Sequence, residues 1–133
     1  MITDDGLMAE WLHLAGVAIY DGFRDANDVA KHFEVQPQDI GGILAAIYNR
    51  EGYEGNALVV YVRDGKLYEA NGSHCSCNGL EGQWSEEETS VPALRKRGYP
   101  RHNWRDGNDY ISEAEQRWLD LLDMLESMGV GKV

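Results

Sequence analysis

The fifteen residues from Asn56 to Ala70, NALVVYVRDGKLYEA, decide the fold. Residues 56–62 are rich in β-branched and aromatic side chains, which favour strands. The Asp64-Gly65 pair that follows accepts the positive φ angles of a type I′ turn, and residues 66–70 resume the strand pattern. The stretch therefore predicts a hairpin of two strands, 56–63 and 66–70.

A third strand is expected beside this hairpin, because an isolated two-stranded hairpin is only marginally stable in water. The apolar run 43–48 is the nearest candidate, although periodicity does not separate a buried strand from a buried helix over so short a run. We expect a small three-stranded antiparallel sheet of strands 43–48, 56–63 and 66–70, with helices packed on one face.

Helical patterns flank the predicted sheet on both sides. Apolar residues recur at spacings of three and four over residues 7–19, and this N-terminal helix is expected to end near Asp21-Gly22. A shorter helix is expected over 27–33, and Ser85 with Glu88 fits a capping box that opens a helix ending near Arg97-Gly98. A final helix follows a second capping box, with one apolar stripe over 111–128. The predicted fold class is α+β, with the sheet packed by N- and C-terminal helices.

Length and composition indicate one domain, residues 1–133. We divide it into a variable helical N-terminus (1–40), the sheet with its following loop (41–97), and a basic loop with the C-terminal helix (98–133). The hydrophobic content of 43% argues against wholesale disorder. We find no pattern of a signal peptide and no apolar run of membrane length. The two cysteines are too close in sequence for a disulfide that would stabilise the fold. We therefore expect a cytoplasmic protein that does not bind membranes.

The chain is strongly acidic, with a formal net charge of −11. Such a charge disfavours direct binding of nucleic acid and of anionic membranes, and suits a partner with a basic surface. The acidic faces of the terminal helices are the candidate binding surface, with Glu10, Asp21, Glu113, Asp120 and Asp123 as its residues.

A basic tract over residues 95–105 interrupts the acidic background and includes two interleaved aromatic residues. This mixture is typical of a patch that binds phosphates and stacks on bases. The alternative is that the tract pairs with the chain's own surplus carboxylates, which we favour because of the net charge.

The most unusual motif is His74-Cys75-Ser76-Cys77, which follows the third predicted strand. His74, Cys75 and Cys77 supply up to three ligands for zinc, and His102 or Asp106 would have to complete the site. A second interpretation is a cysteine nucleophile activated by His74. A third is a structural loop whose cysteines act as small hydrophobic residues, and we favour it. On that interpretation no cofactor is expected.

Several short segments around this motif together form a specific sequence pattern. They are DGKLYE (64–69), GSHCSC (72–77), GLE (79–81), Gln83-Trp84 and Ala93-Leu94. This pattern, within residues 43–97, resembles a family of small proteins of unassigned activity that are encoded largely by tailed bacteriophages and prophages. The resemblance implies a phage gene product acting in the cytoplasm of a bacterial host cell, and it supplies no catalytic residues.

Together these observations predict a small acidic phage-type accessory protein that acts by binding. It is expected to inhibit a host or anti-phage defence protein with a basic surface, with DNA-like charge mimicry as one possible means. The alternative hypothesis is a metal-binding or cysteine-dependent enzyme built on the His74–Cys77 loop.

Overall fold

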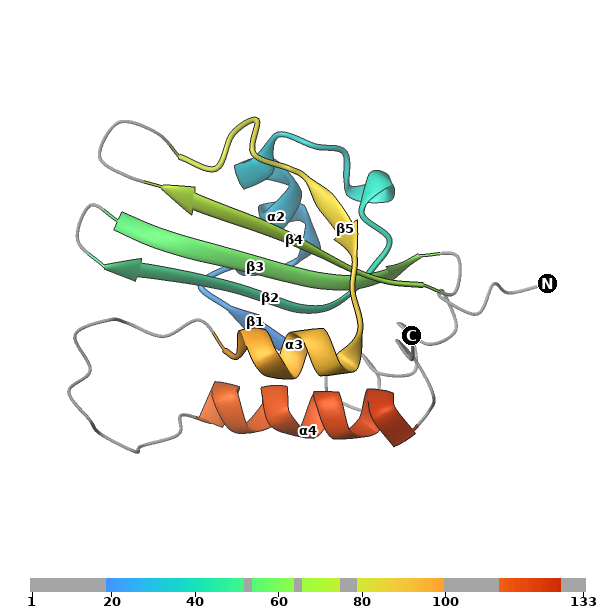
Figure 1. Cartoon of the computed structure of the whole chain (residues 1–133). Helices are drawn as coiled ribbons and strands as arrows, with labels where there is room; N and C mark the ends of the chain where they lie inside the picture. The colour runs from blue at the N-terminus through green and yellow to red at the C-terminus, as the bar shows by residue number, and fades with distance from the viewer. Residues whose placement is uncertain (1–18, 52–53, 64–65, 75–78, 100–112, 128–133) are drawn as a thin grey trace.

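The chain forms a five-stranded sheet and three α-helices in the part that the structure describes (Figure 1). This computed structural model describes residues 19–51, 54–63, 66–74, 79–99 and 113–127, with backbone only at 37, 50, 51, 54 and 74. The expected α+β class is confirmed. The elements are β1 (Ile19–Asp21), α2 (Ala26–Phe33), the 3₁₀ turn η1 (Pro37–Asp39), β2 (Gly42–Glu51), β3 (Glu54–Arg63), β4 (Lys66–His74), β5 (Glu86–Glu88), α3 (Val91–Arg97) and α4 (Glu113–Ser127).

The centre of the sheet is the antiparallel meander expected from the sequence. The predicted strands 43–48, 56–63 and 66–70 lie within β2, β3 and β4, which pair in that order. The tight turn expected at Asp64-Gly65 lies outside the described residues. Arg63 and Lys66 on either side of it are paired, so only two residues connect the strands.

The expected number of three strands is wrong, because short strands add to both edges. Ile19–Asp21 pairs parallel to β2, with Ile19 opposite Ala45, and makes the sheet mixed. Glu86–Glu88 pairs antiparallel to β4, with Glu86 opposite Ala70. Ile19 and Asp21 therefore belong to a strand and not to the end of a helix. The rest of the expected N-terminal helix lies outside the described residues.

Helices cover both faces of the sheet, which corrects the expectation of helices on one face. Alternate residues of β2 belong to different cores, because successive side chains of a strand point to opposite faces. Ala45 and Ile47 lie in the core shared with α3 and α4, whereas Ala46 and Tyr48 lie in the core shared with α2. Figure 1 shows α2 on one side of the sheet and α3 and α4 side by side on the other. Burial on both faces explains why the central strands are continuously apolar.

The helix expected to open at Ser85 begins later. Ser90 is its N-cap and accepts a hydrogen bond from the backbone N–H of Ala93 (3.2 Å), and Pro92 occupies the first turn, where it is tolerated. The acids expected in the first turn are instead β5, whose strand conformation comes from pairing with β4 and not from any apolar pattern of its own. The expected end near Arg97-Gly98 is confirmed.

The C-terminal helix α4 agrees with its sequence pattern. Trp118, Leu121, Leu122 and Leu125 are fully buried against the sheet and α3, as the apolar stripe predicts. The exposed side of α4 is therefore fixed with respect to the sheet. Among the described helices, none is long and apolar enough to cross a membrane.

Candidate functional site

Three of the acids predicted as binding residues lie on the exposed side of α4. Glu113, Asp120 and Asp123 are separated by seven and three residues, so they share one face of the helix, and all three are exposed. Asp120 accepts a hydrogen bond from Gln116 Nε2 at 3.1 Å. We refer to Glu113, Asp120 and Asp123 as the acidic face of α4.

Arg95 of α3 borders the acidic face. One of its terminal nitrogens lies 2.7 Å from Asp123 Oδ1 and 3.1 Å from Glu126 Oε2. The hydrogen bonds that Arg95 donates, that to Asp123 first and that to Glu126 second, raise the pKa of Arg95. Arg95 thus pairs with the chain's own carboxylates, as we favoured for the basic tract. Because the partners are solvent-exposed, the pairs add little stability, but they reduce the charge that Asp123 presents.

The remaining predicted acids are placed elsewhere or are not described. Asp21 ends β1 and accepts a hydrogen bond from the hydroxyl of Tyr99, which follows α3. Burial and this hydrogen bond raise the pKa of Tyr99. Asp21 is therefore engaged in holding β1 to the end of α3 and is not part of the acidic face. Glu10 lies outside the described residues.

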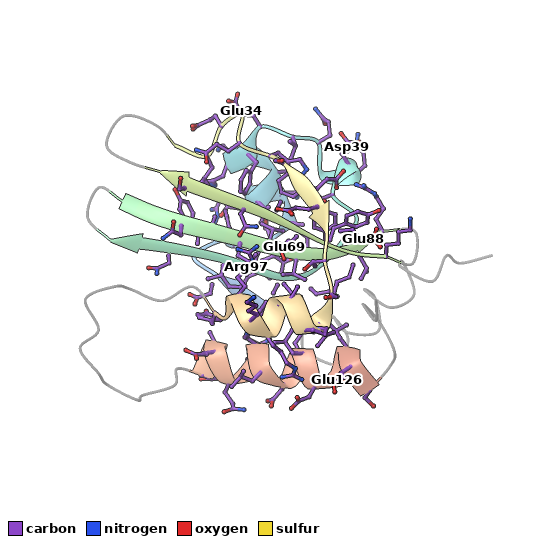
Figure 2. The ribbon with its side chains drawn as sticks, viewed as in Figure 1. Glu34, Asp39, Glu69, Glu88, Arg97 and Glu126 are labelled. Carbon is purple, nitrogen blue, oxygen red and sulfur yellow. The ribbon has the colours of Figure 1, made fainter. Side chains whose placement is uncertain are left out.

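A buried carboxylate links the sheet to α3, and the sequence analysis missed it. Glu69 on β4 is 3% exposed, and its Oε1 lies 2.5 Å from a guanidinium nitrogen of Arg97 (Figure 2). Asn71 Nδ2 donates to the same oxygen at 2.8 Å, and the Thr89 hydroxyl donates to Oε2 at 2.7 Å. The available signal was that Glu69 shares a strand face with the core residue Leu67, since an inward acid requires a partner.

A groove of about 490 Å³ opens beside this ion pair. It lies where the C-terminal end of α3 meets the ends of β3 and β4, and its polar lining comes from Asn56, Asn71, Ser73, Gln83 and Arg97. Its size is within the range of small-molecule sites. No sequence motif marks it, because its lining residues are brought together only by the register of the strands.

The opposite face of the sheet carries an aromatic stack that fixes β5. Tyr61 stacks between Tyr68 and Trp84, with ring centroids 5.6 Å away on each side, and its hydroxyl donates to Glu86 of β5. Arg63 lies 2.9 Å from Glu86 and 4.8 Å above the Tyr68 ring. The hydrogen bond from Arg63 lowers the pKa of Glu86, while burial raises the pKa of Tyr61. This network anchors the edge strand, and its polar groups pair with one another.

The His74–Cys77 motif is described only at its borders. His74 is the last residue of β4, with its side chain not described, and Cys75 and Cys77 lie outside the described residues. Gln83 closes the base of the loop: its amide bonds the backbone N–H and C=O of Ser73 (2.9 and 2.6 Å) and the C=O of Gly79 (2.5 Å). In the described ranges no three His, Cys, Asp or Glu side chains form a group that could hold a metal ion. The metal, nucleophile and structural interpretations of the loop all stay predictions.

Comparison with known proteins adds no relative, because no family model, curated protein or solved structure matches the chain.

Proposed function

We propose that this chain is a small acidic accessory protein of bacteriophage type, which acts in the bacterial host by binding. Its partner is a host or anti-phage defence protein with a basic surface, and binding inhibits that protein. The resemblance of residues 43–97 to phage-encoded proteins supports a role in phage-infected bacteria. The net charge of −11 supports a partner whose surface is positively charged.

The observation that carries the proposal is the acidic face of α4. Glu113 and Asp120 have no cation within 4.0 Å in the described part of the chain, and Asp123 shares its one cation with Glu126. The rest of α4 is rigidly held, since four of its large apolar side chains are fully buried. Exposed carboxylates on a fixed helix steer a partner that has a basic surface and set its orientation.

The spacing of these acids favours ordinary charge complementarity over imitation of DNA. From Glu113 to Asp123 the helix rises about 15 Å and presents three carboxylates on this face. Duplex DNA carries about nine charges over the same length. DNA-like mimicry would therefore require many more carboxylates than α4 supplies, and we propose a protein surface with a few matching Lys or Arg residues.

The test first identifies the partner by crosslinking from α4 and then measures how mutations in the acidic face change its affinity. A photo-crosslinking residue replaces Gln116 at the centre of the acidic face, or Gln38 on η1 as a control, and both chains are expressed in phage-infected bacteria. A protein captured from position 116 and not from position 38 is purified for titration. Equal capture from both positions contradicts binding through α4.

Charge reversal then separates the effect of the acidic face on binding from the effect of net charge alone. Asp120→Lys should weaken binding of the purified partner about tenfold, because one favourable contact becomes repulsive. Glu34→Lys makes the same change in net charge beyond α2, on the other side of the sheet (Figure 2), and should change affinity less than about twofold. Equal losses would show a non-specific charge effect, and no loss from Asp120→Lys would refute the proposed surface.

A further inference from the structure

A row of polar side chains crosses the sheet beyond the core that α3 and α4 cover. Asn49, Asn56 and Ser73 are directly opposite one another on β2, β3 and β4. They share the face of the core residues Ile47 and Leu58, two positions away on their own strands. Side chains directly opposite on neighbouring strands are close enough to contact one ligand. We call Asn49, Asn56 and Ser73 the polar row.

The groove beside α3 opens over two members of this row. Asn56 and Ser73 line it directly, and Arg97 and Asn71 complete its polar lining, while Gln83 borders it with an amide already used by backbone groups. Glu69 holds Arg97 in place through one guanidinium nitrogen. The groove therefore combines the guanidinium held by Glu69 with further N–H donors, the amide oxygen of Asn71 and an exposed amide at Asn56.

The polar row is incomplete as a hydrogen-bond network. The Oδ1 atom of Asn49 is buried and has no hydrogen-bond partner among the described residues. Asn56 lies directly opposite Asn49, and its side chain is exposed. A buried acceptor without a donor is costly, and such groups require an explanation in a folded protein. A ligand that orders the Asn56 amide would also let it donate to Asn49.

The charges around the groove restrict what it can hold. The charges of Arg97 and Glu69, 2.5 Å apart, largely cancel, so neither a cation nor an anion gains much in the groove. An apolar ligand would remove water from amides without replacing their hydrogen bonds. The remaining class is an uncharged molecule that offers donors and acceptors side by side.

We propose that this groove binds an uncharged nucleoside through the planar donor–acceptor edge of its base. Guanine suits the arrangement best: its O6 and N7 accept from an arginine, and its N–H groups can donate to the Asn71 oxygen. The volume accommodates a nucleoside. The inference does not depend on α4, which lies outside the groove lining.

The test is an NMR titration of the ¹⁵N-labelled full chain with guanosine, uridine, glucose and guanosine 5′-monophosphate as separate probes. Guanosine should give saturable shifts at the side-chain amides of Asn56 and Asn71 and at the Gly98 backbone, with α4 unchanged. Asn56→Ala should weaken guanosine binding at least fivefold, whereas Gln116→Ala, which removes an exposed amide from α4, should leave it unchanged.

Other outcomes overturn the proposal. They are no saturation with guanosine up to about 1 mM, shifts centred outside the groove, uridine or glucose binding as tight as guanosine binding, or equal effects of the two variants. Tenfold tighter binding of the monophosphate would show an anion site instead. Should Asn56→Ala lower the melting temperature substantially, Ser73→Ala takes its place, with the same expected loss.

Discussion

Removing Arg97 tests the buried ion pair between β4 and α3 most sharply. The Glu69 side chain is 4% exposed and that of Arg97 is 43% exposed, so the carboxylate depends more on the pair than the guanidinium does. Among the described residues, Arg97→Ala leaves the buried carboxylate with the donors of Asn71 and Thr89 alone. A hydrogen bond to a charged group contributes about 1.5–3 kcal/mol. Because Arg97 is partly hydrated in the folded protein, we expect a loss of about 2 kcal/mol, at the lower part of that range.

The matched variant is Glu69→Gln, which keeps the shape and removes the charge. Its amide oxygen can still accept from Asn71, and its nitrogen can donate to the Thr89 hydroxyl, so the network is conserved while the need for a cation disappears. In that background, Arg97→Ala should cost only about 0.5 kcal/mol, which gives a coupling energy of about 1.5 kcal/mol.

Urea unfolding, followed by tryptophan fluorescence and far-ultraviolet circular dichroism, measures all four chains of this cycle. The expected result is a lower midpoint for Arg97→Ala with an unchanged slope. A loss below about 0.5 kcal/mol in the wild-type background, or a coupling energy near zero, would refute the reasoning that Arg97 compensates the buried charge of Glu69.

Three further predictions concern other parts of the chain. Asn49→Leu should raise the free energy of unfolding by about 1 kcal/mol, because it removes a buried acceptor without a partner, and a decrease in urea unfolding would contradict this. The hydrogen bond from Arg63 holds the pKa of Glu86 below its usual 4.5, so its stabilisation is present above that value and lost as the pH falls through the folded pKa. Glu86→Gln should flatten the acid side of the stability profile, and an unchanged profile would exclude this origin. If the loop is structural, protein purified without added metal contains no zinc, and Cys75→Ser or Cys77→Ser lowers stability by about 1–3 kcal/mol. Stoichiometric zinc by elemental analysis would instead support the metal site.

The central strands and the helix α4 follow from local sequence. β-Branched and aromatic residues mark 56–63, the Asp64-Gly65 pair predicts the reversal, and the burial of Trp118 and its neighbours follows from helical spacing. The edge strands β1 and β5 could not be predicted in this way. Their three residues each adopt strand conformation through pairing with β2 and β4, and the glutamates of β5 even fit a helix start.

The candidate sites likewise differ in whether local sequence or tertiary packing determines them. The shared face of Glu113, Asp120 and Asp123 is a consequence of spacing along one helix, so it was predictable from the sequence. Asp21 was assigned to a helix face that it does not occupy, because its strand depends on a distant partner. The groove lies beyond any local pattern, since Asn56 and Arg97 meet only after the sheet and α3 have packed.

The salt dependence of partner binding tests the role of the acidic face most directly. The purified partner is titrated with the wild-type chain and with the Glu113→Gln/Asp120→Gln variant, from low salt to physiological ionic strength. The screening length between exposed charges falls to about 8–10 Å as the salt approaches physiological ionic strength, so wild-type affinity should fall steeply and the variant's affinity should be both lower and less dependent on salt. Equal affinities and equal salt slopes for the two chains would contradict binding through α4.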